Sequence, residues 1–198
     1  MADAKALGAD PSRSLFLADR ATKPQVMELN RDRLANTRVV AFATHALIGG
    51  ELVGLKEPAL VLTPPPQLTE TNDGLLSLED VLGLKFKQTQ WVVLSACNTA
   101  APGGSGEGFS GLTRAFFYAG TPSLLVSQWS VDDVATDQLM TTLFTAYGQG
   151  AKISRAAALH DAMLGLMGAP RTDPSHAYFA HPFASAPFIV VGEGGGSS

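Results

Sequence analysis

The stretch Trp91-Val-Val-Leu-Ser-Ala-Cys97-Asn-Thr-Ala100 decides the fold class of this chain. Its first four residues are all apolar and lack the alternation of apolar and polar residues that a half-solvated strand shows. They predict a strand buried on both faces, as in a parallel sheet. The run leads into the only cysteine among the 198 residues. The end of this strand is therefore a candidate position for a reactive side chain.

Other apolar runs of the same kind predict further buried strands. They cover residues 38–43, 58–62, 123–127 and 188–191. Between the runs, apolar residues recur at helical spacing, in one stripe that stops at Gly120, in a second that stops near Gly148, and in a third helix over residues 152–167. The two stripes are Phe109, Leu112, Phe116 and Ala119, and Ala135, Leu139, Leu143 and Ala146. Strands that alternate with helices predict an α/β fold, a three-layer α/β/α sandwich with a mostly parallel sheet.

The composition excludes several classes of partner. The chain has 14 basic and 18 acidic residues, a formal net charge of -4, and no run of Lys or Arg, so we expect no nucleic-acid or anionic membrane partner. The first ten residues have no apolar core of the kind that a secretion signal needs, and no apolar run approaches the length of a membrane span, so we expect neither feature. One cysteine cannot form an intrachain disulfide, which agrees with a cytoplasmic location.

Two chemically capable side chains follow predicted strands. His45 follows residues 38–43 and Cys97 follows residues 90–95, and glycine-containing loops come after both. If the two strands are neighbours in a parallel sheet, the imidazole and the thiol meet at the same edge. An imidazole that takes the thiol proton would make the sulfur a usable nucleophile. The alternative is a small core cysteine and a loop histidine without a catalytic role.

Several stretches of the chain together resemble the CHAT domain, a caspase-like module often found behind tetratricopeptide repeats. They are FATHALIGGELVG, DGLLSLEDVLGL, WVVLSACNTA, GEGFSGLTRAFFYAGTPSLLVSQWSVDD and SAPFIVVGEG. The resemblance covers residues 21–193 and implies a caspase-like domain there. The first 20 residues hold only a weak strand candidate at residues 15–17, and residues 194–198 form a tail that is flexible by composition.

The resemblance implies a cysteine endopeptidase with a dyad of His45 and Cys97. These residues are 52 positions apart, close to the separation in caspases. The backbone N–H groups of Cys97 and of residue 46 would hold the oxyanion. Residue 46 is alanine here, where the family usually has glycine. Alanine keeps the N–H, but its methyl group excludes positive φ and could crowd a substrate backbone.

A second departure is that the family's usual upstream strand and repeats do not precede the helix expected near residues 21–23. The chain is consistent with the catalytic piece of a larger protein. The partners implied are a protein or peptide substrate, and tetratricopeptide repeats in the same chain or in a partner chain.

The segment after the strand 123–127 carries two acids, Asp132 and Asp133, beside Trp129. It resembles the separase segment whose acidic residue receives a basic side chain, and Asp133 is the matching position. This implies cleavage after Arg or Lys. Asp132 and Glu107 are the fallback acids for this pocket. Another interpretation is structural, because Ser130 and Asp133 have the spacing of a capping-box variant, and Glu107 suits a helix terminus.

No cofactor is expected. The glycine-rich residues 103–108 lack the Gly-Lys-Ser/Thr ending of a phosphate loop, which argues against a nucleotide-binding domain. The remaining histidines share no ligand spacing with clustered carboxylates, so no metal site is predicted. The main alternative to a peptidase is a catalytically silent caspase-like interaction module.

Overall fold

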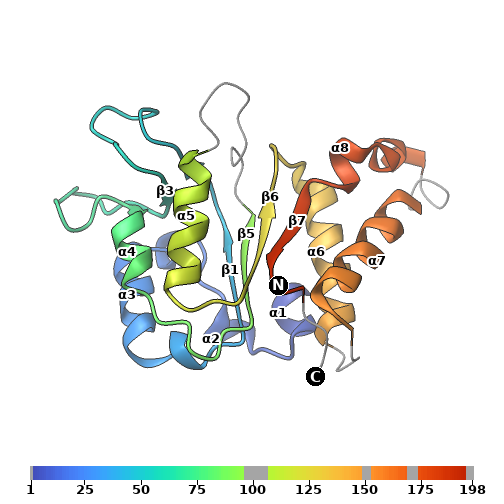
Figure 1. Cartoon of the computed structure of the whole chain (residues 1–198), viewed down its shortest axis with the longest axis horizontal. Helices are drawn as coiled ribbons and strands as arrows, with labels where there is room; N and C mark the ends of the chain where they lie inside the picture. Colours follow the sequence, from blue (N-terminus) through green and yellow to red (C-terminus); the bar gives the residue numbers. More distant parts are fainter. Residues whose placement is uncertain (1, 96–106, 149–152, 169–173, 195–198) are drawn as a thin grey trace. The chain divides into compact units, whose positions relative to one another are not determined.

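The computed structural model describes residues 2–95, 107–148, 153–168 and 174–194. The chain divides into two compact units (Figure 1). One is Phe16–Ser130, and the other combines Met1–Leu15 with Val131–Ser198. The predicted α/β class with mostly parallel strands is confirmed, because the central strands pair in parallel and helices separate them along the chain.

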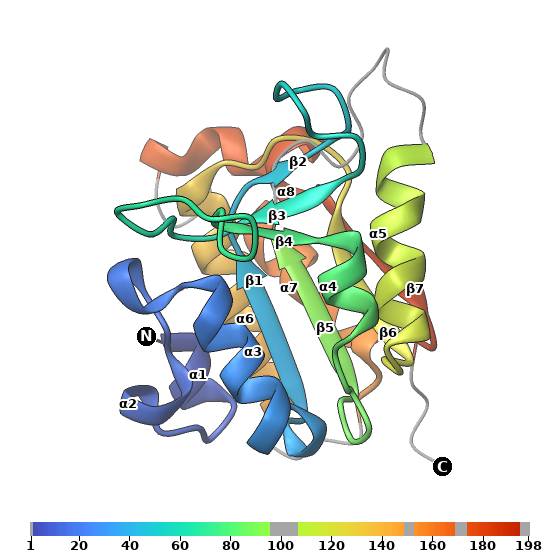
Figure 2. The same cartoon turned by 90° about the vertical axis from the view of Figure 1, so that its left-hand side faces the viewer.

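The Phe16–Ser130 unit is built on a parallel sheet with the strand order β1-β5-β6. These strands are β1 (Val39–Ala43), β5 (Trp91–Ser95) and β6 (Ser123–Ser127). Helices α3 (Lys23–Asp32), α4 (Leu78–Leu82) and α5 (Glu107–Tyr118) lie on one face of this sheet (Figures 1 and 2). Short 3-10 turns, η1 (Ala18–Arg20) and η2 (Leu34–Asn36), precede and follow α3.

An aromatic cluster fills the space between the sheet and its helices. The ring of Phe116, on α5, lies 5.8 Å from the ring of Phe42 on β1 and 5.9 Å from the ring of Phe86. All three side chains are buried. Gly120 has a φ of +105° and ends the α5 turn, as the sequence predicted. The apolar stripe of α5 therefore fixes that helix on the sheet that carries His45.

A small antiparallel sheet follows His45. Its strands are β2 (Ala46–Leu47), β3 (Ala59–Val61) and β4 (Leu75–Ser77), in the order β2-β3-β4. Leu60 and Leu76 face each other across β3 and β4 and are both fully buried. The sheet begins only one residue after His45, so it fixes the direction in which the chain leaves that histidine.

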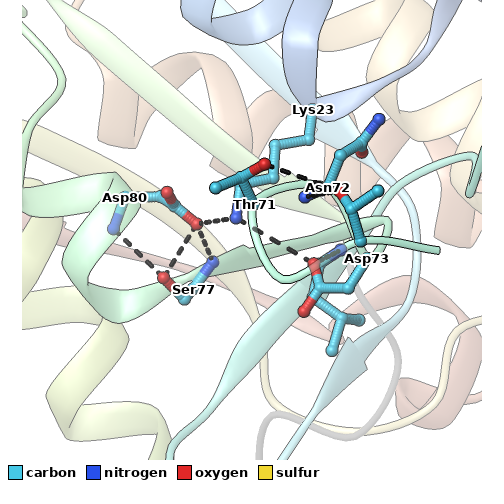
Figure 3. A network of polar contacts seen from close by, with 8 residues as sticks. Lys23, Thr71, Asn72, Asp73, Ser77 and Asp80 are labelled. Atoms are coloured by element: carbon cyan, nitrogen blue, oxygen red, sulfur yellow. Dashed lines mark hydrogen bonds and ion pairs between the residues drawn. The ribbon is translucent and has the colours of Figure 1, made fainter.

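A network of polar contacts ties α3 to the end of this small sheet (Figure 3). Ser77 and Asp80 form a capping box at the start of α4, with each side chain bonded to the other residue's backbone N–H. The ammonium of Lys23, which is 12% exposed, lies 2.7 Å from Asp80 and 3.9 Å from Asp73. Partial burial acts to raise the pKa of Asp80, but hydrogen bonds from Lys23 and Ser77, with the Lys23 charge, outweigh it and lower that pKa.

The other unit packs helices around its own core. Its elements are α1 (Ala2–Ala6), α2 (Pro11–Ser14), α6 (Asp133–Gly148), α7 (Arg155–Gly168), η4 (Pro174–Ala180), α8 (Pro182–Ser185) and β7 (Phe188–Gly192). Asp3 accepts a hydrogen bond from Thr141, and a Cβ on Gly148 would overlap the carbonyl oxygen of Ala6. Only glycine therefore allows α1 to lie this close to the end of α6.

Several sequence expectations are corrected by the structure. The run 58–62 becomes β3, which belongs to the antiparallel sheet, because an apolar run alone does not reveal its pairing partner. Strand β1 is not buried on both faces, since Ala41 and Ala43 are exposed. Residues 15–17 form no strand, and Leu15 instead caps α2. Helix α7 begins at Arg155 rather than at Lys152, which lies outside the described residues.

Within the described ranges, none of the helices combines the length and the apolar character needed to cross a bilayer.

We expect Asp80→Asn to lower the free energy of unfolding by about 1–3 kcal/mol at pH 7, because the α4 cap and Lys23 lose an anionic acceptor. The pKa of Asp80 is lowered by folding, so this contribution is complete above about pH 4 and is lost as the pH falls through the lowered value. Urea unfolding at pH 7 and at pH 3 should show the difference between wild type and variant shrinking in acid.

The matched control is Asp73→Asn. Asp73 is 44% exposed and farther from Lys23, and asparagine can still accept the hydrogen bond that Leu75 donates to it. We expect less than about 0.5 kcal/mol at either pH. Equal effects at the two positions, or a pH-independent Asp80 effect, would contradict the electrostatic account.

Candidate functional site

The candidate site begins where β1 and β5 end. The two strands are parallel neighbours, and their register pairs Ala43 with Ser95. The pairing continues one step further, because the Thr44 N–H donates to the Ser95 carbonyl at 3.2 Å. His45 and Cys97 can meet only if these two strands are neighbours, and this condition is confirmed. His45 lies two positions after Ala43, and Cys97 lies two positions after Ser95.

His45 is held by its backbone and by its neighbour Thr44. The Val61 N–H donates to the His45 carbonyl at 2.8 Å, and the Thr44 hydroxyl donates to the Val61 carbonyl. The residue is exposed, and its imidazole has no hydrogen-bond or ion-pair partner within the described part of the chain. Hydrogen bonds thus fix the backbone at residues 44 and 45, while the His45 imidazole stays exposed to solvent.

Ala46 is the first residue of β2 and is only 7% exposed. It pairs with Leu60, but the flanking bond from Val61 to His45 shows that positions 46 and 60 form a non-hydrogen-bonded pair. The Ala46 N–H therefore points away from β3. Since β2 is the edge strand of its sheet, this N–H faces the open side of that edge.

The alanine causes no backbone conflict at this position. Ala18 is the only non-glycine residue with positive φ in the described ranges, so Ala46 does not occupy the conformation that favours glycine. Its methyl group is buried rather than exposed. Whether this methyl group crowds a substrate backbone stays a prediction from the sequence.

Cys97 and the glycine-rich residues 103–106 lie outside the described residues. Glu107 is the first residue of α5, as expected for a helix terminus, and its side chain is also outside the description. The structure thus describes the histidine side of the candidate dyad and the strand leading to the cysteine. The pairing of His45 with Cys97 stays a prediction.

The acids after β6 differ sharply in their contacts. The Asp132 carboxylate accepts the backbone N–H of Ala135 at 2.8 Å, which makes Asp132 the N-cap of α6. It also accepts the Tyr178 hydroxyl at 3.2 Å. The expected capping box of Ser130 and Asp133 is wrong, because α6 begins at Asp133 and the capping position is therefore 132.

Asp133 is exposed, and no hydrogen bond or ion pair engages its side chain within the described residues. The two neighbouring acids therefore differ in their contacts. The Asp132 carboxylate stabilises the fold, whereas the Asp133 carboxylate is exposed to solvent. Trp129, in the segment after β6, is half-buried. Trp129 and Asp133 belong to different units of the chain.

Tyr178 is the residue that the sequence argument missed. Loss of water contact raises the pKa of the Tyr178 hydroxyl, and its bond to the Asp132 carboxylate adds to the effect. Its ring meets Phe179 edge to face at 4.7 Å, and Phe179 is fully buried. Asp132 and Tyr178 are 46 positions apart, and no pattern in the sequence between them could have linked the two.

No group of three or more His, Cys, Asp or Glu side chains in the described ranges could hold a metal ion. His160 is exposed on α7 beside Asp161, and His181 caps α8 by accepting the Phe183 N–H. His160 is therefore a residue of the helix surface, and His181 has a local structural role.

The sequence matches the CHAT domain family over residues 2–193, and the chain therefore belongs to this family. It is also similar to two curated proteins. It is 28% identical over 220 residues to tetratricopeptide repeat protein 28 of Mus musculus, an alignment that covers 94% of this chain. It is 29% identical over 206 residues, 87% of this chain, to tetratricopeptide repeat protein 28 of Homo sapiens. The chain spans only 8% of the length of either relative.

Proposed function

We propose that this CHAT domain is a cysteine endopeptidase in which His45 and Cys97 form the catalytic dyad. The observation that carries the proposal is the parallel register of β1 and β5, because the two strands that precede His45 and Cys97 in the sequence are neighbours and end at the same edge of the sheet. Adjacent strands lie about 4.8 Å apart, within the reach of an imidazole and a thiol. The exposed His45 ring without a partner in the described residues supports the same function.

In the proposed reaction the His45 imidazole accepts the thiol proton of Cys97, and the thiolate attacks the substrate carbonyl carbon. The backbone N–H groups of Ala46 and Cys97 hold the resulting oxyanion, each worth about 3 kcal/mol in the transition state. The C–N bond breaks as His45 returns the proton to the leaving amine. A water molecule then gives its proton to His45 and hydrolyses the thioester, which restores the thiol.

The open β2 edge supports the role assigned to Ala46. An oxyanion donor must have an N–H that is not used in a sheet ladder, and the Ala46 N–H points away from β3. Because the strand register sets this direction, alanine in this backbone presents the same N–H donor as glycine would.

We further propose that Asp133 receives an Arg or Lys side chain of the substrate. Its carboxylate is exposed and uncommitted within the described residues, whereas Asp132 is committed to the α6 cap and to Tyr178. A basic side chain can form a charge-assisted hydrogen bond there, and an acidic one meets a like charge. This favours Asp133 over the fallback acid Asp132; Glu107 has no described side chain to weigh.

The names of the two relatives favour a partner as well as a substrate. Both are called tetratricopeptide repeat proteins, so we propose that such repeats, in the same chain or in a partner, act together with this domain. A domain that acts together with such repeats would also suit the second candidate function, a catalytically silent interaction module. We propose a cytoplasmic location, since the single cysteine agrees with a reducing compartment.

Cys97→Ala should abolish cleavage of a fluorogenic peptide library without changing the unfolding midpoint, because it removes the sulfur and little volume. His45→Ala should lower kcat by about 100-fold or more, the usual contribution of a positioned acid and base. Wild-type turnover in the Cys97 variant would rule out the peptidase function. Loss of stability without loss of kcat would make His45 structural.

Two substitutions at residue 46 separate the N–H from the side chain. Ala46→Pro removes the N–H without breaking the β2–β3 ladder, and we expect kcat/KM to fall by about 100-fold or more. Ala46→Gly keeps the N–H and should retain activity equal to or above that of the wild type, with about 1 kcal/mol lower stability.

The rate of Cys97 alkylation serves as the control for this pair. An unchanged rate in the proline variant shows that His45 still lies beside the thiol. A proline variant with wild-type kcat/KM would mean that the oxyanion is held elsewhere.

Asp133→Ala should reduce cleavage after Arg and Lys by about tenfold or more, and should not reduce the slow cleavage of Asp-terminated peptides. Asp137→Ala is the matched control, because Asp137 is an exposed acid one turn further along α6. The readout is kcat/KM for fluorogenic peptides that differ only in the residue before the cleaved bond. A wild-type preference for Asp, or an Arg preference that survives Asp133→Ala unchanged, would defeat this assignment.

A further inference from the structure

The loop between β2 and β3 presents two apolar side chains to solvent at its turn. Val53 is fully exposed and Leu52 is 48% exposed. We call this pair the hairpin tip. Turns of this kind usually carry polar residues, so an exposed leucine and valine together call for a physical reason.

The loop that carries the hairpin tip is ordered by its own hydrogen bonds. The Gly50 N–H donates to the Leu55 carbonyl at 2.8 Å, and the Leu55 N–H donates to the Leu52 carbonyl at 3.0 Å. The Glu51 carboxylate accepts the Ile48 N–H at 2.8 Å. The two apolar side chains are therefore held outward by a fixed backbone.

Three glycines make this backbone possible. Gly50 and Gly54 have φ values of +93° and +90°, which other residues rarely adopt. A Cβ on Gly49 would overlap the carbonyl oxygen of Lys56. The sequence Gly49-Gly-Glu-Leu-Val-Gly54 thus builds a tight turn that holds the hairpin tip away from the core.

The hairpin tip lies close to His45 along the chain. It lies seven and eight residues after His45, on the loop that extends β2, and this loop rises from the end of β1 (Figure 2). Eight residues span at most about 26 Å, and an extended substrate of similar length covers the same distance. A polypeptide bound at His45 can therefore reach the hairpin tip with a residue several positions from the bond that is cut.

The apolar area of the hairpin tip indicates what kind of molecule can bind to it. A leucine and a valine bury at most a few hundred Å², far below the roughly 1,200 Å² of a stable protein interface. The same area is too small to hold a chain on a membrane, where a single acyl chain is already marginal. It is sufficient to strengthen the binding of a ligand that is held mainly elsewhere.

We propose that the hairpin tip is an accessory subsite that binds an apolar side chain of the polypeptide substrate, outside the residues next to the cleaved bond. This inference rests on the proposed peptidase function and adds a second determinant to its specificity. A substrate would then need a basic residue at the cleaved bond and an apolar residue some positions away.

The test compares Leu52→Ser/Val53→Ser with wild type on fluorogenic peptides that share one arginine at the cleaved bond. One is a four-residue peptide, and the others are 16-residue peptides with a single leucine placed three to eight residues from the arginine on either side. We expect wild type to cleave at least one leucine peptide about tenfold faster, in kcat/KM, than its serine counterpart. The double variant should lose this advantage and cleave the four-residue peptide as wild type does.

The matched control is Leu68→Ser, which removes another exposed leucine from a loop of the same unit. It should keep the leucine advantage. A double variant that retains the full advantage, or a control that loses it equally, would overturn the accessory subsite.

Binding separates this inference from the peptidase proposal. In the Cys97→Ala background, fluorescence anisotropy of the labelled 16-residue peptides should show about tenfold tighter binding of the leucine peptide, and this difference should vanish when the hairpin tip is changed. If wild type binds in this way but cleaves nothing, the peptidase proposal fails and the subsite stands. If it cleaves but neither assay responds to the hairpin tip, the subsite fails and the peptidase proposal stands.

Discussion

The pairing of β1 with β5 is the constraint on which the rest of the Phe16–Ser130 unit depends. The two strands come from segments about fifty residues apart, and their parallel register aligns Ala43 with Ser95. Parallel strands need a long crossover between them, and here it includes the antiparallel β2-β3-β4 sheet and α4. This crossover begins directly after β1, at residues 44 and 45. The position of the His45 backbone is therefore set by the parallel sheet. Burial of Phe42 against Phe116 holds the same strand from its helical side.

The small antiparallel sheet fixes the direction of the Ala46 N–H. Because Val61 bonds to the His45 carbonyl, the next residue must direct its own N–H away from β3. The direction of that N–H is thus set by the register of β2 and β3 and not by the side chain at residue 46. An alanine at residue 46 therefore leaves this backbone N–H in place, as a glycine would. The Lys23, Ser77 and Asp80 contacts stabilise the far end of the same sheet.

The sequence predicted the parts of the fold that local patterns specify. The apolar run 91–94 identified β5, and Gly120 marked the end of α5. Local patterns could not predict that residues 58–62 would pair with β2, because the partner of a strand is chosen by tertiary packing. They also could not place Tyr178 against Asp132, and they gave the capping position to Ser130 because the start of a helix is uncertain by one or two residues.

The candidate site was predictable to a similar extent. Two polar residues at the ends of neighbouring strands gave His45 and Cys97 from the sequence, and the neighbouring strands are found as assumed. The different contacts of Asp132 and Asp133 were not predictable, because either acid could have been the N-cap of α6. The exact first residue of the helix decides between them, and here it is Asp133. One is used as a cap, and the other is left with an exposed carboxylate.

The central claim is that the His45 imidazole lies beside the Cys97 thiol, and the pH dependence of thiol alkylation tests it most directly. Iodoacetamide labelling of Cys97 should be measured from pH 5 to pH 9 in wild type and in His45→Gln. The account predicts that wild type reacts about tenfold or more faster than the variant at pH 6, and that the two rates converge near pH 9, where a thiol ionises without help. Identical profiles with a common midpoint near 8.5, the value of an isolated thiol, would contradict it.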